Sequence, residues 1–216
     1  MYKYRFFAFG IMLLQLFSYC GSSNKTTSSG TEVVIPSTKV STTEATKPVK
    51  TSPEPPKKLD TETTLYIQKK YAPYLHTTPE AITNIKLYHF IDQWLNTPYL
   101  WGGMDKKGID CSAFMQRLLG EVYGIYIPRT SVDQFFADWV DRFGSRTDLS
   151  EGDLVFFKTM KGKAISHVGL YLGNRMFINS SSSKGVSFGN LDDPYWKPKY
   201  VAAGRIKQNM LGKARL

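Results

Sequence analysis

The fold of this 216-residue chain is decided by the stretch 99–112, which reads YLWGGMDKKGIDCS. Two glycine-containing turns lead into Cys111, and apolar residues then recur at helical spacing at Phe114, Met115, Leu118, Leu119 and Val122. This pattern predicts a helix that begins at Cys111, with Asp110 as its N-cap. A thiol in the first helical turn lies near the positive end of the helix dipole, which favours the thiolate. Cys111 is therefore a candidate nucleophile, and the alternative is a buried structural thiol.

The composition allows one folded domain with extensions. Hydrophobic residues make up 42% of the chain and aromatic residues 14%, and the formal net charge is +10. That charge is spread along the chain, with +2 in residues 1–20, +2 in residues 21–60 and +6 in residues 61–216. Dispersed charge favours a general attraction to anionic surfaces over a stripe that follows phosphates. We expect no nucleic-acid partner.

Residues 1–20 have the pattern of a secretory signal peptide. Lys3 and Arg5 precede a mostly apolar run, residues 6–17, which is too short for a convincing spanning helix. Cys20 closes this run before Gly-Ser-Ser and resembles the acylated cysteine of the bacterial lipobox, although Tyr19 departs from the small residue usual before it. We expect an exported lipoprotein, anchored to a membrane of the cell envelope through Cys20. The alternative is a simple cleaved signal peptide.

Residues 21–60 are predicted to form a disordered tether, and residues 61–216 the folded domain. Ser, Thr, Pro and Lys supply 26 of the 40 tether residues, and none of the 40 is aromatic. Such a segment cannot bury enough apolar surface to offset the entropy lost on ordering. Acylation or removal of Cys20 would leave Cys111 unpaired in an exported protein, which favours a reactive role for that thiol.

The rest of the pattern predicts helices followed by strands, which is typical of an α+β fold. We expect one helix over residues 79–95 and another from about 131 through Phe143, on either side of the Cys111 helix, which ends around residues 120–124. Strands are predicted at 154–157, 166–172, 175–179, 185–188 and 200–206. Gly173–Asn174 is the predicted turn of a hairpin between the second and third of these strands.

The predicted hairpin places His167 and Asn179 on the same face of the sheet. With a loop centred on Gly173 they would lie directly opposite each other, with Cβ atoms about 4.5–5.5 Å apart. The asparagine oxygen can then accept the proton of one imidazole nitrogen and leave the other nitrogen free to act on a thiol. This predicts a Cys-His-Asn arrangement. The alternative is that backbone groups satisfy His167 and that Asn179 is a turn or edge residue.

Further motifs follow one another in order along the chain. They are YxWGG and GIDCS within 99–112, PRTS at 128–131 with Gln134, EGDLVFF at 151–157, HVGLYLGN at 167–174 and FINS at 177–180. In order and spacing they resemble the NlpC-type family of cell-wall cysteine peptidases, over about residues 82–206. The resemblance implies a papain-like α+β domain in which N-terminal helices precede a nucleophile helix packed on a central antiparallel β-sheet.

The resemblance also implies a role for six residues: nucleophile Cys111, base His167, third polar residue Asn179, oxyanion-holding Tyr99, and cleft-lining Asp110 and Ser112. The third residue of the family is most often histidine; asparagine can orient an imidazole but carries no charge. The implied activity is hydrolysis of a D,L-type amide in peptidoglycan stem peptides or cross-links. The alternatives are a non-catalytic wall-binding lipoprotein and a thiol acyltransferase or amidase. We expect a monomer without a cofactor, and the three histidines show no metal-ligand spacing.

Overall fold

The computed structural model describes residues 60–213 of the chain. The predicted signal peptide, Cys20 and the tether up to residue 59 lie outside the described residues, so they stay predictions. The described residues all belong to one compact unit, Glu54–Leu216. Between residues 60 and 213, no helix has the length and apolarity needed to cross a membrane.

Two helices begin the described part of the chain. Helix α1 (Thr61–Tyr71) starts after Asp60, whose side chain accepts a hydrogen bond from the backbone N–H of Thr63. A short 3-10 turn, η1 (Pro79–Ala81), precedes helix α2 (Ile85–Trp94). The helix predicted over 79–95 is therefore wrong in its first six residues. Asn84 caps a separate helix start, because its side chain accepts a hydrogen bond from the backbone N–H of Leu87.

Helix α3 (Cys111–Leu118) begins where the sequence predicts. The Asp110 side chain accepts a hydrogen bond from the backbone N–H of Ala113 at 2.8 Å, which is the geometry of an N-cap. The helix continues as a π-helical turn, η2 (Leu119–Tyr123), and ends at Gly124, whose φ of +69° lies in the left-handed region. The predicted apolar face is buried at Phe114, Met115, Leu118, Leu119 and Val122.

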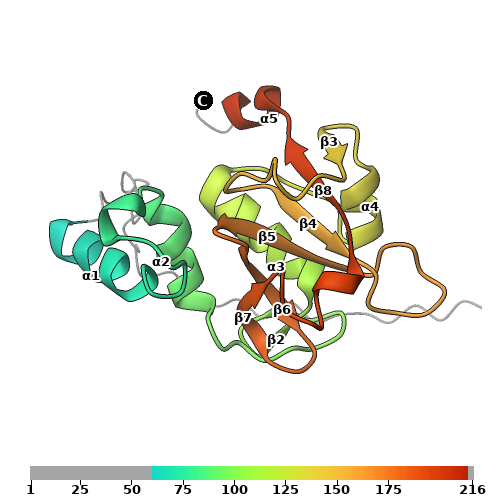
Figure 1. Ribbon diagram of the computed structural model, residues 1–216, viewed down its shortest axis with the longest axis horizontal. Coiled ribbons are helices and arrows are strands. Elements are labelled where there is room, and N and C mark those ends of the chain that lie inside the picture. Colours follow the sequence, from blue (N-terminus) through green and yellow to red (C-terminus); the bar gives the residue numbers. More distant parts are fainter. Residues whose placement is uncertain (1–59, 214–216) are drawn as a thin grey trace, which may run out of the picture. The chain divides into compact units, whose positions relative to one another are not determined.

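Six antiparallel strands form the main sheet, in the order β3-β8-β4-β5-β6-β7 (Figure 1). Their bounds are β3 Val140–Phe143, β4 Leu154–Phe157, β5 His167–Gly173, β6 Met176–Ser181, β7 Gly185–Asn190 and β8 Tyr200–Ile206. Helix α3 packs on β5 and β6, and α2 packs on α1 and α3. The predicted α+β class, with the Cys111 helix on an antiparallel sheet, is confirmed.

The remaining elements are short. A two-stranded ribbon, β1 (Met104–Asp105) and β2 (Gly108–Ile109), lies directly before α3. Helix α4 (Ser131–Phe136) follows the Cys111 helix, a 3-10 turn η3 (Lys197–Lys199) precedes β8, and α5 (Gln208–Lys213) ends the described chain.

The helix predicted through Phe143 ends at Phe136. Residues 140–143 form the edge strand β3, with Val140 opposite Ile206 and Phe143 opposite Ala203. The prediction was wrong because the strand that pairs with this segment comes far later in the chain. A local hydrophobic pattern cannot indicate such a partner, and tertiary pairing overrides local propensity here.

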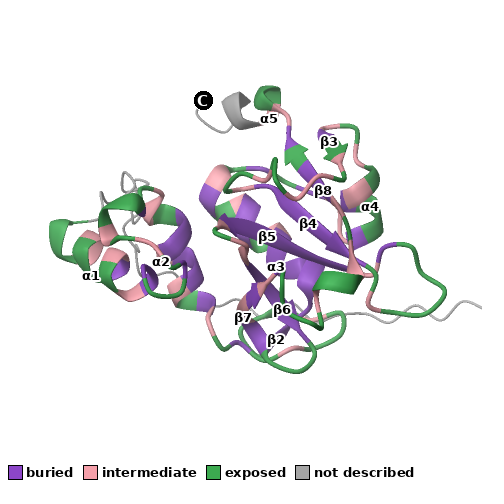
Figure 2. Cartoon of the chain, in the orientation of Figure 1, coloured by how far each residue is buried: buried purple, intermediate pink, exposed green. Residues whose placement is uncertain are grey.

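Both faces of the central strands are buried (Figure 2). The main core, which includes α3, contains residues such as Phe156, Val168 and Leu170. The opposite face carries a second cluster of Val155, Phe157, Tyr171, Phe177 and Leu191, against which Trp196 and Tyr200 pack. His167 contacts two rings of this second cluster, Phe157 and Trp196. The imidazole therefore lies on the sheet face opposite the one that carries Val168.

The β5–β6 hairpin forms, but its turn lies one residue later than predicted. Asn174 and Arg175 both have positive φ, 47° and 67°, as in a type I′ turn, and Gly173 pairs with Met176. The predicted turn residues Gly173–Asn174 are therefore wrong by one position. The sequence signal was ambiguous because Gly173–Asn174 and Asn174–Arg175 can both supply the two central residues of such a turn.

A bulge between Tyr171 and Gly173 moves the register back by one position, so that Leu170 lies opposite Ile178. The residue next to Asn179 on the facing strand is therefore Gly169, and a Cβ added to Gly169 would lie 3.2 Å from the Asn179 Cβ. The predicted direct pairing of His167 with Asn179 is wrong. The shift amounts to two positions, so both side chains still lie on the same face of the sheet.

Candidate active site

Cys111 is the first residue of α3, and 6% of its surface is exposed. Its thiol lies against the backbone of Val168 on β5, and hydrogen bonds with backbone groups of Val168, Ser112 and Cys111 itself lower its pKa. Burial has the larger effect and raises the pKa of the thiol to about 11. The helix start acts in the predicted direction, but the expected thiolate does not result, because desolvation of the charged sulfur dominates.

His167 opens β5 and is buried. Its Nε2 lies 3.0 Å from Oδ1 of Asn179, and the amide Nδ2 of Asn179 donates to the backbone carbonyl of Ser187 at 3.1 Å. The second bond orients the amide, so its oxygen faces the ring. Because that oxygen can only accept, Nε2 carries the proton and Nδ1 carries the lone pair. One nitrogen of His167 is therefore anchored, and the other is available to accept a proton.

The contact between His167 and Asn179 is diagonal, because Asn179 lies opposite Gly169 and not opposite His167. The absence of a side chain at Gly169 makes this contact possible. A Cβ there would lie 2.8 Å from the backbone oxygen of Ile178 and 3.2 Å from the Cβ of Asn179. With no such atom, the amide of Asn179 can extend across to the ring two positions away on the facing strand. Diagonal pairs on neighbouring strands are within reach of side chains of this length.

Aromatic rings enclose the imidazole of His167. Trp196 stacks on it with ring centroids 5.1 Å apart and an interplanar angle of 29°, and Phe157 lies 6.0 Å away. Burial lowers the pKa of His167 to about 4, and the hydrogen bond with Asn179 acts in the opposite direction. The ring is therefore neutral at neutral pH. Trp196 was not predicted, since it lies in an irregular segment after β7 that has no periodic pattern.

Cys111 and His167 line adjoining cavities. The cavity that contains Cys111 has a volume of about 450 Å³, and the cavity that contains His167 has a volume of about 210 Å³. Both are lined by Tyr99, Trp101, Met160 and Ser166. In the described part of the chain, the thiol and the imidazole are not hydrogen-bonded to each other. The structure brings the sulfur to the backbone of the residue that follows the histidine.

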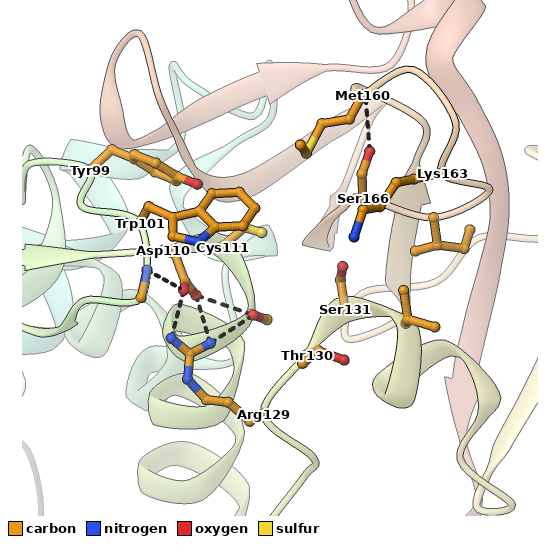
Figure 3. Close-up of a pocket in the computed structure, with 14 residues that line it drawn as sticks. Tyr99, Trp101, Asp110, Cys111, Arg129, Thr130, Ser131, Met160, Lys163 and Ser166 are labelled. Atoms are coloured by element: carbon orange, nitrogen blue, oxygen red, sulfur yellow. Dashed lines mark hydrogen bonds and ion pairs between the residues drawn. The ribbon is translucent and has the colours of Figure 1, made fainter. Parts of the chain in front are cut away.

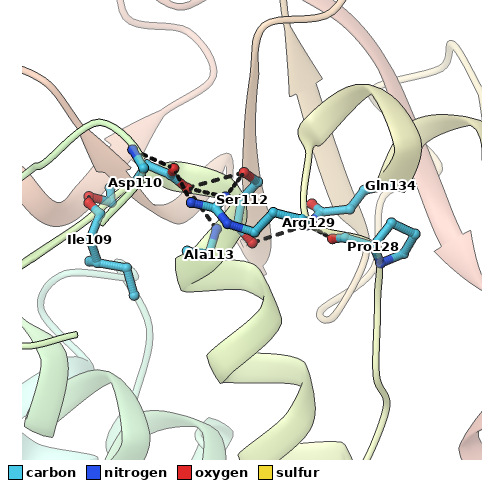
Figure 4. A network of polar contacts seen from close by, with 9 residues as sticks. Ile109, Asp110, Ser112, Ala113, Pro128, Arg129 and Gln134 are labelled. Carbon is cyan, nitrogen blue, oxygen red and sulfur yellow. Dashed lines mark hydrogen bonds and ion pairs between the residues drawn. The ribbon is translucent and has the colours of Figure 1, made fainter. Parts of the chain in front are cut away.

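Asp110 and Ser112 line the Cys111 cavity, but their polar atoms are engaged within the protein (Figures 3 and 4). The Arg129 guanidinium bonds both carboxylate oxygens of Asp110, at 2.6 and 3.0 Å, and also the hydroxyl of Ser112 at 3.0 Å. Burial raises the pKa of Asp110, but hydrogen bonds from Arg129 and from the Ala113 N–H lower it more, so the net shift is downward. Asp110 is therefore a charged structural centre at the start of α3.

Arg129 and Gln134 complete this network from the segment that follows α3. The Gln134 Nε2 donates to the backbone carbonyls of Ser112 at 3.0 Å and Pro128 at 2.8 Å (Figure 4). Sequence reasoning assigned no role to either residue. Their only signal was membership of the motif PRTS and the glutamine that follows it, because a contact between residues 110 and 129 has no periodic signature.

Tyr99 stands at the junction of the two cavities. Burial raises the pKa of its hydroxyl to about 12, and the nearby Cys111 and Asp110 act in the same direction. The group therefore stays protonated and can donate a hydrogen bond. Figure 3 shows the hydroxyl pointing toward the side of the cavity that holds the Cys111 sulfur. Trp101 lies beside it with 71% of its surface exposed.

No group of three or more His, Cys, Asp or Glu side chains within residues 60–213 is arranged to hold a metal ion. The chemical groups gathered at the two cavities are a thiol, a neutral imidazole, a phenol and backbone N–H groups. Such a set can carry out nucleophilic attack on a carbonyl with proton transfer between sulfur and nitrogen. The fold and site thus define an α+β domain with a helix-start cysteine beside a His-Asn pair.

The chain belongs to the NlpC/P60 family, whose model matches residues 96–205, just over half of the chain. A probable endopeptidase NlpC homolog of Haemophilus influenzae is 41% identical over 115 residues, which cover 53% of this chain and 58% of that protein. The murein DD-endopeptidase MepS/murein LD-carboxypeptidase of Escherichia coli is 41% identical over 113 residues, which cover 52% of this chain and 57% of that protein. The match thus spans less than two thirds of these relatives.

A solved structure shows the same architecture. The crystal structure of an NlpC/P60 family protein from Bacillus cereus superimposes with a TM-score of 0.50 and 30% sequence identity. The matched region covers 57% of this chain and 40% of that one. The similarity supports the α+β assignment over the domain that contains Cys111 and His167.

Proposed function

We propose that this chain is an exported thiol peptidase that hydrolyses a D,L-type amide in peptidoglycan stem peptides or cross-links. The observation that carries the proposal is the placement of the Cys111 thiol against Val168, directly beside a histidine whose Nε2 is held by Asn179 at 3.0 Å. A buried structural thiol would need neither an open cavity nor an oriented imidazole that lines the adjoining one. Both are present here.

In the proposed mechanism the Cys111 sulfur attacks the amide carbonyl carbon while its proton passes to Nδ1 of His167. The Tyr99 hydroxyl and the backbone N–H groups at the start of α3 stabilise the negative oxygen that forms. His167 then gives the proton to the leaving amine as the carbon–nitrogen bond breaks. Water, deprotonated by the same imidazole, hydrolyses the thioester and restores the thiol.

The resting enzyme would hold a neutral thiol and a neutral imidazole. The pKa of Cys111 is raised to about 11 and that of His167 is lowered to about 4, in both cases chiefly by burial. Proton transfer would therefore accompany nucleophilic attack and would not precede it. The lack of a thiol–imidazole hydrogen bond is compatible with this mechanism, since catalytic hydrogen bonds often form only once substrate is bound.

The substrate class is supported by the names of relatives. The Escherichia coli relative is described as a murein DD-endopeptidase and LD-carboxypeptidase, and a Bacillus subtilis relative as a bifunctional muramidase/DL-endopeptidase. We assign this chain the same class of substrate. The scissile bond would be either γ-D-glutamyl to diaminopimelate in a stem peptide or D-alanyl to diaminopimelate in a cross-link.

The same proposal includes the location of the enzyme. Residues 1–20 would direct export, acylated Cys20 would anchor the chain to a membrane of the cell envelope, and residues 21–60 would tether the domain of residues 61–216. The sequence pattern supports this placement, as do the envelope substrates named for the relatives. The working unit would be a monomer, because one chain contains all the proposed catalytic groups.

Digestion of purified muropeptides tests the activity. We expect wild type to release shorter peptides with new amine termini, and Cys111→Ala to lose at least about 10³-fold in kcat/KM, since no other side chain can replace the nucleophile. Cys20→Ser is the matched control: it removes the other cysteine, and we expect it to keep cleavage of soluble muropeptides while losing detergent partitioning. Binding without cleavage by wild type, or transfer of the acyl group to an added amine, would contradict the proposal.

A further inference from the structure

A third cavity, with a volume of about 270 Å³, adjoins the cavity that contains His167. Among the described residues, it shares Ser181, Tyr195 and Trp196 with the His167 cavity and none with the cavity that contains Cys111. The cavities therefore follow one another in the order Cys111 cavity, His167 cavity, third cavity. In the proposed mechanism the acyl group is bonded to the Cys111 sulfur, and the leaving amine takes its proton from His167. The third cavity thus lies on the side of the leaving amine.

Two opposite charges line the third cavity, and they do not contact each other. Lys184 lies in the turn between β6 and β7, and Asp193 follows β7. Neither forms an ion pair with a residue between 60 and 213, and no other charged residue in that range lines the cavity. A ligand with a single charge would be attracted by one of them and repelled by the other. A ligand with both charges can bind both.

Backbone hydrogen bonds hold the two charged residues in place. The N–H of Lys184 donates to the carbonyl of Ser181 at 3.3 Å. The carbonyl of Asp193 accepts from the N–H groups of Trp196 at 3.0 Å and Lys197 at 2.8 Å. Because the backbone at both positions is fixed, a ligand would have to order only the two side chains, which lowers the entropy cost of binding.

The rest of the lining is apolar or already engaged. Phe188 and Trp196 contribute partly buried rings. The amide of Asn179 also lines the cavity, but its oxygen is bonded to His167 and its nitrogen to the carbonyl of Ser187. The third cavity can therefore receive an aliphatic chain that ends in a positive and a negative group.

We propose that Lys184 and Asp193 form a subsite that binds the amino-acid end of the leaving residue, an ammonium and a carboxylate on one carbon atom. The carboxylate would accept from the Lys184 ammonium, and the ammonium would donate to the Asp193 carboxylate. The subsite deepens the proposed function and rests on it. Diaminopimelate that leaves through the amine of one centre presents such an end at its other centre, unless a cross-link acylates that second amine. The subsite would thus favour stem peptides with a free diaminopimelate end.

Binding to a protein that lacks the nucleophile tests the subsite. Full-length protein with Cys111→Ala is titrated in a calorimeter with L-alanyl-γ-D-glutamyl-diaminopimelate in three forms. The diaminopimelate centre that is not bonded to glutamate is left free, acetylated on its amine, or amidated on its carboxylate. We expect each modification to weaken binding about 3- to 5-fold at low salt, because each removes one exposed ion pair. Both losses should become smaller as salt screens the charges.

Variants assign each charge of the ligand to its partner. In the Cys111→Ala background, Lys184→Met should abolish the loss caused by amidation and keep the loss caused by acetylation. Asp193→Asn should do the opposite, and its side-chain oxygen can still accept the hydrogen bond from the Tyr195 N–H. Lys197→Met is the matched control: Lys197 is an exposed lysine near Asp193 that lines none of the three cavities, so both losses should remain.

Equal affinity for the three peptides, or no measurable binding of the free peptide, would overturn the subsite. The same holds if Lys184→Met and Asp193→Asn each reduced both losses alike, or if Lys197→Met acted as strongly as Lys184→Met, since the general charge of this surface would then explain the preference. Failure of the proposed function gives a different result. Wild type would then not cleave the free peptide, while the two losses and their separate removal would still be measured.

Discussion

The two adjoining cavities, which form the Cys111 end and the His167 end of one cleft, are stabilised by different interactions. At the Cys111 end, the Asp110–Arg129 ion pair fixes the start of α3, and Lys163 adds a charge that forms no ion pair within residues 60–213. At the His167 end, the lining is uncharged, and the imidazole is held by the stacked ring of Trp196 and the amide of Asn179. Charged contacts weaken with salt, whereas packed rings do not. We therefore expect the two ends to respond to different perturbations.

The largest expected effect comes from removing the base at the uncharged end. His167→Gln can keep a hydrogen bond to Asn179 but cannot accept a proton, so kcat/KM for muropeptide cleavage should fall at least about 10³-fold. His89→Gln is the matched control, because His89 is a partly buried histidine on α2 that lines neither cavity. Similar losses in the two variants would show that the effect comes from folding and not from the base.

The second effect is on stability in acid. The ordinary pKa of His167 is 6.5 and its pKa in the folded protein is about 4. Between these values the unfolded chain binds a proton that the folded chain does not, so stability falls as the pH falls from 6.5 to 4, by about 3 kcal/mol. Urea unfolding at pH 7 and pH 4 should show this loss of stability in wild type. In His167→Gln the loss should be smaller by the part that comes from protonation of His167. An identical loss in the variant would contradict a neutral buried imidazole.

The charged end should weaken at lower pH. The pKa of Asp110 is shifted below its ordinary value of 3.8, so its contribution is complete above that pH and is lost as the pH falls through the folded value. Extending the unfolding series below pH 4 should therefore show a second decline in wild type and in His167→Gln alike. A single decline in the free energy of unfolding, with none below pH 4, would contradict a separate contribution from the charged end.

The third effect isolates the orientation of the imidazole. Asn179→Ala removes the acceptor of the Nε2 proton while leaving the base in place, so kcat should fall about 10- to 100-fold with little change in KM. Asn190→Ala, on the neighbouring strand β7, is the control, because its side chain bonds the Met176 sulfur and the backbone N–H of Asp192 and lines neither cavity. Should KM rise in proportion for Asn179→Ala, the residue would instead contribute to substrate binding.

The smallest effect concerns the shape of the cation at the charged end. Arg129→Lys keeps the charge but loses the two-pronged contact with Asp110, which should lower the free energy of unfolding by about 1 kcal/mol. Arg142→Lys serves as the control, since that arginine donates only to the backbone carbonyl of Phe135. The difference between the two variants should shrink in high salt, and a difference independent of salt would mean that packing of the side chain dominates.

Local patterns predicted the elements whose signals are contained within a few residues. The cap at Asp110, the apolar face from Phe114 to Val122 and the strand 154–157 were each indicated by neighbouring residues. Errors arose where a distant partner decides the outcome. Residues 140–143 become a strand because β8 is available to pair with them. The start of α2 is a different kind of error, because the Asn84 cap that sets it is a local contact with Leu87.

The pairing of His167 with Asn179 shows both situations at once. Alternation along the two strands placed the side chains on one face, and that depends only on the parity of their positions. The actual register came from a bulge and a late turn, which no local signal specified. The hydrogen bond forms nonetheless, because Gly169 leaves room for a diagonal contact.

The sequence by itself determined the helix that begins at Cys111, the α+β order of elements and the candidate residues, because capping, periodicity and motif order are local properties of the chain. Only the tertiary structure decided the resting state of those residues. The pKa of Cys111 rises and that of His167 falls because both are desolvated by segments far away in sequence. The charge of Asp110 is balanced by Arg129, which no sequence spacing connects to it. Burial and long-range pairing are properties of the packed molecule, and they set its chemistry.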